Sequence, residues 1–109
     1  MTDRALFRLQ RLSALLLAPL VLVHLGLILW AIRDGLSASE ILDRTSGSTP
    51  WALFYGAFVV AAAIHAPIGV RNVLRELTPI PRIVIDGFCA AMGFALLMMG
   101  LRAVWLVTL

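Results

Sequence analysis

Charged side chains are scarce in this sequence of 109 residues, of which 14% are Asp, Glu, Lys or Arg and 61% are hydrophobic. Lysine is absent, so arginine supplies the basic side chains other than the histidines. The single cysteine, Cys89, excludes an intrachain disulfide and a zinc or iron-sulfur site built on several cysteines. A glycine-rich nucleotide-binding motif is also missing. A composition this apolar excludes an ordinary water-soluble globular domain.

Two long runs carry no charged residue. Residues 12–32 and 45–70 contain no Asp, Glu, Lys or Arg, and each is long enough to cross a hydrocarbon core of about 30 Å as a helix. In a third apolar run, Asp86 and Arg102 lie near the ends, where charges reach the lipid headgroups. The runs predict an all-α integral membrane protein of one domain, residues 1–109, with transmembrane helices at about 12–33, 50–73 and 83–107.

Three helices are too few to enclose a transport pathway, so we expect half of a helical bundle that a second membrane-anchor subunit completes. The arginines predict its orientation, because cytoplasmic connections carry an excess of Lys and Arg. They precede the first span and flank the second connection (Arg4, Arg8, Arg11, Arg71, Arg75 and Arg82). We therefore expect a multi-pass protein of a bacterial cytoplasmic (inner) membrane with a cytoplasmic N-terminus. The net charge of +3 reflects topology, and no nucleic-acid partner is expected.

The polar connections between the runs carry helix-start signals. Ser37 and Glu40 have the spacing of a capping box, which predicts a short surface helix in the first connection. Pro50 suits the first turn of the second span.

Both histidines of the chain, His24 and His65, fall inside predicted spans. An ionisable side chain in lipid is costly and needs a partner, so a metal-ligand or proton-relay role is the default interpretation. The alternative is a plain hydrogen bond between helices. The second histidine lies in the stretch IHAPIGVRNVLRE, residues 64–76.

The neighbours of His65 suggest a slot for haem. Gly69 lies one turn away on the same helix face, where the missing side chain leaves room for a flat macrocycle. Arg71 follows toward the cytoplasm, where a guanidinium pairs with carboxylates such as a haem propionate. Taken singly, Gly69 is equally explained as a helix-packing glycine and Arg71 as a topological anchor.

The two histidines differ in predicted depth. At about 1.5 Å per residue, His24 lies roughly 18–20 Å from the cytoplasmic start of its span and His65 roughly 9 Å from the cytoplasmic end of its own. Because the two ligands of one haem iron face each other across the ring, a depth difference of about 10 Å makes them poor partners for one iron. The spacing favours two haems, each completed by a histidine of another chain.

A polar cluster marks the start of the first span. Gln10, Arg11 and Ser13 place an amide, a guanidinium and a hydroxyl beside an apolar segment, a combination that hydrogen-bonds quinone carbonyl groups. Ser13 and His24 lie on one helical stripe through Leu17 and Leu20. The alternative interpretation of the cluster is a helix cap with a topological arginine.

With these motifs the sequence resembles the membrane-anchor cytochrome b subunits of the succinate dehydrogenase and fumarate reductase (complex II) family. His65, Gly69, Arg71 and Glu76 occupy the places of that family's second-helix signature. Arg11 and Ser13 match the arginine and serine of its quinone-site motif HRxSG, in which Gln10 replaces the histidine and Ala14 the glycine. The spacing from Gln10 to His24 is similar to that of the two-haem members.

The resemblance implies a function as the anchor and cytochrome b subunit of a succinate:quinone oxidoreductase. It implies that haem b is bound, with His24 and His65 as axial ligands and with Gly69 and Arg71 beside the ring. It also implies that ubiquinone or menaquinone binds near Gln10, Arg11 and Ser13. It also implies iron-sulfur and flavoprotein subunits on the cytoplasmic face, where the dicarboxylate reaction takes place outside this chain. Two alternatives stay open: a one-haem anchor in which His24 is structural, and a cofactor-free assembly subunit of a respiratory or transport complex.

Overall fold

The computed structural model describes residues 2–109, which form four α-helices and, within that range, no strand. They are α1 (Asp3–Asp34), α2 (Ala38–Thr45), α3 (Thr49–Leu77) and α4 (Arg82–Thr108). Three of them, α1, α3 and α4, are long and apolar enough to cross a membrane. The prediction of an all-α fold with three membrane-spanning helices is confirmed.

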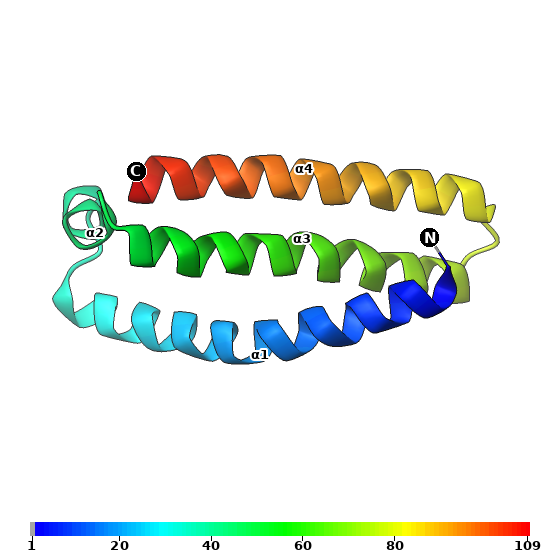
Figure 1. Ribbon diagram of the computed structural model, residues 1–109, viewed down its shortest axis with the longest axis horizontal. Helices are drawn as coiled ribbons and strands as arrows, with labels where there is room; N and C mark the ends of the chain where they lie inside the picture. Colours follow the sequence, from blue (N-terminus) through cyan, green and yellow to red (C-terminus); the bar gives the residue numbers. More distant parts are fainter. Residues whose placement is uncertain (1) are drawn as a thin grey trace.

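The three long helices lie side by side along one axis, with α3 between α1 and α4 (Figure 1). The start of α1, the end of α3 and the start of α4 meet at one end of the bundle, which we call the N-terminal end. The short helix α2 lies at the other end, the α2 end, near the C-terminus (Figure 1). The bundle measures 48 × 22 × 22 Å.

The helix starts follow the capping signals of the sequence. Thr2 accepts a hydrogen bond from the Ala5 N–H at 3.1 Å, so α1 begins at Asp3, well before the predicted membrane entry. The predicted capping box of α2 is present: the Ser37 hydroxyl accepts from the Glu40 N–H, and the Glu40 carboxylate accepts from the Ser37 N–H. Hydrogen bonding to the carboxylate, first from the Ser37 backbone N–H and then from the Ser37 side chain, lowers the pKa of the Glu40 carboxyl below its ordinary value.

Small residues allow α3 and α4 to approach closely. Pro67 lies inside α3 and cannot donate to the carbonyl of Ala63, the usual acceptor one turn earlier. Gly93 of α4 lies over this position, since a Cβ there would stand 3.3 Å from the Ala63 oxygen and 3.2 Å from Pro67 Cγ. Cys89, one turn before Gly93, is buried in the same contact. The turn of α3 that contains Pro67 is thus covered by small side chains of α4.

Gly100 of α4 is the tightest of these contacts, because a Cβ there would collide with the side chain of Val59. We expect Gly100→Ala to destabilise the helical bundle by about 1–3 kcal/mol through overpacking. Unfolding of the purified protein in mixed micelles, followed by circular dichroism during an SDS titration, measures the change. Gly87→Ala is the matched control on the same helix, where a Cβ meets nothing within 4 Å. Equal stability of the two variants would contradict the close contact between α3 and α4.

One stripe of α1 faces α3, and the rest of its surface is exposed. Ser13 is buried and Leu17, Leu20 and His24 are half-buried, as the predicted stripe requires. Leu15, on the opposite side, is 70% exposed. Because exposed leucines are unfavourable in water, this outer face is suited to lipid or to another membrane helix.

Candidate functional site

The histidine of α3 is held by the serine of α1. His65 Nδ1 lies 3.2 Å from the Ser13 hydroxyl oxygen, and that hydroxyl donates to the backbone carbonyl of Gln10 at 3.0 Å. Ser13 is only 6% exposed, whereas the ring of His65 is half-buried. Two segments that the sequence separates by 52 positions therefore form one polar contact between two membrane helices.

Gln10 and Gly69 belong to the same cluster. A Cβ on Gly69 would stand 3.4 Å from the side-chain nitrogen of Gln10, so the amide lies over the glycine. The amide oxygen of the same side chain, Gln10 Oε1, is buried and has no hydrogen-bond partner among residues 2–109. A buried acceptor without a donor is unfavourable, which makes this oxygen available to a ligand.

His24 lies closer to the α2 end, among aromatic rings of α3. Its ring meets those of Tyr55 and Phe58 edge-on, with centroids 5.9 and 5.4 Å apart. Cavities of about 320 and 250 Å³ border it. Its Nδ1 is buried without a partner in the described part of the chain. Unlike His65, this histidine forms no hydrogen bond through its ring nitrogens within residues 2–109.

The two histidines occupy different levels of the bundle. His65 lies level with Ser13, and His24 follows Ser13 by 11 residues on α1, or roughly 16 Å of helix. Measured along α3, the Tyr55 and Phe58 rings that contact His24 precede His65 by roughly 10–15 Å. Both helices thus support the separation predicted from the sequence, and one metal ion cannot bind both rings.

Arg71 lies apart from the His65 cluster and joins the three long helices at the N-terminal end. Its Nε donates to Asp86 of α4 at 2.7 Å, and its Nη2 donates to Asp3 of α1 at 3.1 Å. The Arg71 side chain is only 11% exposed, against 51% for Asp86 and 69% for Asp3. Six positions separate His65 from Arg71, which places the two side chains about 120° apart around the helix, so the guanidinium leaves the face that carries the imidazole.

Arg11 is also separated from the cluster, although Gln10 and Ser13 are its close neighbours in sequence. Its side chain is exposed, and the guanidinium carbon stands 5.7 Å from the centroid of the Phe7 ring. The structure therefore brings together Gln10, Ser13, His65 and Gly69, and it places His24, Arg71 and Arg11 elsewhere.

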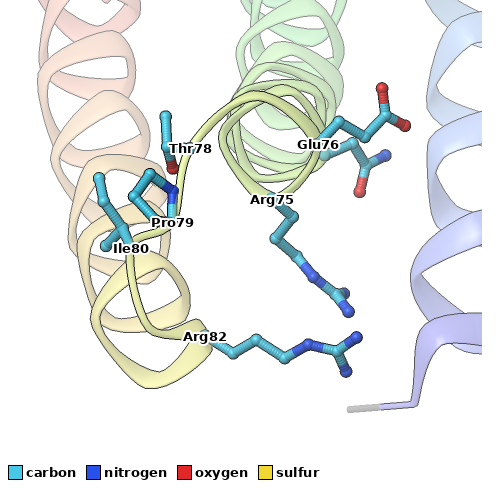
Figure 2. A pocket seen from close by; sticks show the side chains of 7 residues that line it. Arg75, Glu76, Thr78, Pro79, Ile80 and Arg82 are labelled. Atoms are coloured by element: carbon cyan, nitrogen blue, oxygen red, sulfur yellow. The ribbon is translucent and has the colours of Figure 1, made fainter.

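A polar pocket of about 510 Å³ opens at the turn between α3 and α4 (Figure 2). The side chains of Arg75 and Arg82 extend in the same direction there, away from Pro79 and Ile80 (Figure 2). Arg75 also donates to Asp3 at 3.2 Å. The N-terminal end thus presents guanidinium groups beside a stiff, proline-rich turn.

The sequence reasoning missed two participants. Asp86 was expected to reach the headgroups, and it pairs with Arg71. The sequence signal for this pair is that a basic and an acidic residue lie on either side of the short turn between two helices. Tyr55, to which the sequence analysis assigned no contact, lies against His24. Its signal was the aromatic run that begins at Trp51.

Comparison with known proteins is consistent with this arrangement. No curated protein and no solved structure matches the chain significantly. Residues 2–80, which include α1, α2 and α3, match the model of the family described as succinate dehydrogenase/fumarate reductase transmembrane subunit. The match covers most of the chain and includes Gln10, Ser13, His65 and Gly69. The chain therefore belongs to the family of succinate dehydrogenase and fumarate reductase transmembrane subunits.

Proposed function

We propose that the chain is the haem- and quinone-binding anchor of a succinate:quinone oxidoreductase, through which electrons pass between an iron-sulfur subunit and membrane quinone. The observation that carries this proposal is the contact between His65 and Ser13 in a member of this family. One ring nitrogen of His65 is engaged by a buried hydroxyl, and the other is left free to bind a metal. Metal-binding histidines ordinarily have such a partner on the second nitrogen.

The residues around His65 fit a haem with one ligand from this chain. When bound, haem supplies reversible one-electron transfer. A single imidazole lies at this level, so any further protein ligand of a bound haem would come from another chain, which we assign to a second anchor subunit. The exposed outer face of α1 gives such a subunit a surface on which to pack.

The quinone site is proposed beside this cluster. Gln10 Oε1 is a buried acceptor without a donor, and a quinol hydroxyl provides the missing hydrogen bond. Arg11, exposed at the same level of α1, remains in the proposal as a donor to a quinone carbonyl at the helix surface. The headgroup is that of ubiquinone or menaquinone.

The N-terminal end is proposed to face the cytoplasm, as the arginine distribution predicts for a bacterial inner membrane protein. The iron-sulfur and flavoprotein subunits would then cover the turn between α3 and α4. Arg82, which is exposed there, is suited to a carboxylate of the iron-sulfur subunit (Figure 2), whereas Arg75 is already paired with Asp3.

For His24 we propose a second haem at the level of Tyr55. Its support is the orphaned Nδ1 beside an apolar cavity, since a buried nitrogen without a partner calls for a ligand. The edge-on packing of the ring against Tyr55 and Phe58 favours the competing one-haem anchor, in which His24 is structural.

The proposed function is tested with the complex purified from its native membrane. We expect a b-type band in the dithionite-minus-oxidised spectrum and quinone reduction that depends on succinate. A complex with no b-type band and a blank pyridine haemochrome would remove the haem proposal. It would favour a cofactor-free assembly subunit, whose histidine substitutions affect stability and leave electron transfer intact.

Gly69→Ala distinguishes room for haem from ordinary helix packing. Within this chain an added Cβ makes only van der Waals contact with Gln10, at 3.4 Å, so we expect the fold to tolerate it. A haem bound at Gly69 would take the place of the Gln10 amide and meet the new methyl group, so we expect lower haem content per complex at unchanged thermal stability. Gly56→Ala on the same helix, where a Cβ meets nothing within 4 Å, is the control. Haem content equal to that of the control would contradict the role of Gly69.

A further inference from the structure

We propose that Ser13 is a positioning residue for His65, which fixes the protonated nitrogen of the imidazole at Nδ1 and presents the Nε2 lone pair to a metal ion. This inference rests on the proposed function, in which His65 binds haem. It moves Ser13 from the quinone site to the support of the haem ligand.

The direction of each hydrogen bond follows from counting protons. A serine hydroxyl has one proton, and a backbone carbonyl has none to give. In the contact between Ser13 and the Gln10 carbonyl, at 3.0 Å, the hydroxyl must therefore be the donor. Its oxygen then accepts the second bond, at 3.2 Å, so His65 Nδ1 carries the hydrogen. In the neutral imidazole, Nε2 is left unprotonated.

The surroundings make this arrangement persistent. Ser13 is 6% exposed, so water does not compete for its hydroxyl. The carbonyl that accepts its proton belongs to the same turn of α1, and the imidazole belongs to α3. Rotation of the ring therefore requires a break in the contact between the two helices.

The same count excludes Ser13 as a donor to quinone. Its single proton is already given to the Gln10 carbonyl, and a quinone carbonyl is only an acceptor. An acceptor on Nδ1–H makes the imidazole a more basic ligand, which favours the ferric form of a bound haem. The predicted effects of losing the hydroxyl are weaker haem binding and a higher haem midpoint potential.

The experiment compares Ser13→Ala with Ser13→Thr in the complete complex. Haem affinity is measured by competition with apomyoglobin, and the midpoint potential by redox titration. We expect Ser13→Ala to bind haem roughly 10- to 100-fold more weakly and to raise the potential, because the outer partner of the ligand is lost. Ser13→Thr, which keeps a hydroxyl, should restore both values. Thr78→Val is the control, since it removes a hydroxyl at the C-cap of α3 that donates only to the Leu74 carbonyl.

The outcomes separate this inference from the function on which it rests. Wild-type affinity and potential in Ser13→Ala, with a raised KM for quinone, would overturn the inference and return Ser13 to the quinone site. A wild-type complex without haem, or one whose haem survives loss of His65, would overturn the proposed function itself. Weaker binding and a raised potential in Ser13→Ala with rescue by Ser13→Thr would support both.

Discussion

Replacing His65 with glycine should remove the haem at the N-terminal end of the bundle almost completely, and added imidazole should restore it. The substitution deletes the one imidazole at this level but leaves the Ser13 hydroxyl bonded to the Gln10 carbonyl, so the contact between helices loses a partner and gains no unpaired donor. The amplitude of the b-type band per complex measures the loss. Recovery of the band with millimolar imidazole distinguishes a ligand from a packing residue, because free imidazole can bind the haem iron in place of the missing side chain but cannot restore helix packing.

Two results would count against His65 as the ligand. One is a glycine variant that keeps the b-type band at wild-type amplitude. The other is a band that disappears together with the assembled complex and does not return with imidazole. Ala66→Gly, a neighbouring exposed position of α3, controls for the flexibility that glycine adds to a helix.

The second large effect is expected at the ion pairs of Arg71. Asp86→Leu removes the nearest partner of a guanidinium that is only 11% exposed and leaves it with the more exposed Asp3. Breaking a buried ion pair costs about 3–5 kcal/mol, and because Asp86 is half-exposed we expect about 1–3 kcal/mol here. An SDS titration of the purified protein measures the loss.

The double variant Arg71→Met/Asp86→Leu supplies the decisive comparison. Replacing both charges with apolar side chains of similar size removes the unpaired charge, so most of the lost stability should return. Asp3→Asn, at a position 69% exposed, should destabilise the protein much less than Asp86→Leu does. A double variant no more stable than Asp86→Leu would contradict this account of Arg71.

The same double variant examines the propionate role predicted for Arg71. If the Arg71 guanidinium only joins helices, the double variant should recover its stability and keep its full haem content. Loss of haem at normal stability would place Arg71 at a haem carboxylate, in exchange for Asp3 or Asp86.

Much of the fold was predictable because lipid imposes simple rules on sequence. Two charge-free runs and a third apolar run with charges only near its ends predicted the three spans, and the capping box between Ser37 and Glu40 predicted the start of α2. The depth difference between His24 and His65 needed only the rise of a helix, and the contacts of both rings support it.

The pairing of side chains was harder to predict, because it depends on how each helix is rotated against its neighbour. His65 and Arg71 are close in sequence and were assigned to one slot, yet their side chains leave the helix in directions about 120° apart. Ser13 was assigned to quinone because nothing local shows that its face of α1 meets His65. Asp86 and Asp3 come to Arg71 from two other helices, a relation that no spacing within one segment reveals.

Haem analysis of paired histidine variants tests the central claim most directly. The complex is purified with His65→Ala or His24→Ala, and haem per complex is measured by pyridine haemochrome together with low-temperature spectra. The separation of the two rings by roughly 10–16 Å along the helices predicts that His65→Ala loses a haem that His24→Ala retains. Loss of one and the same haem in both variants would contradict the account.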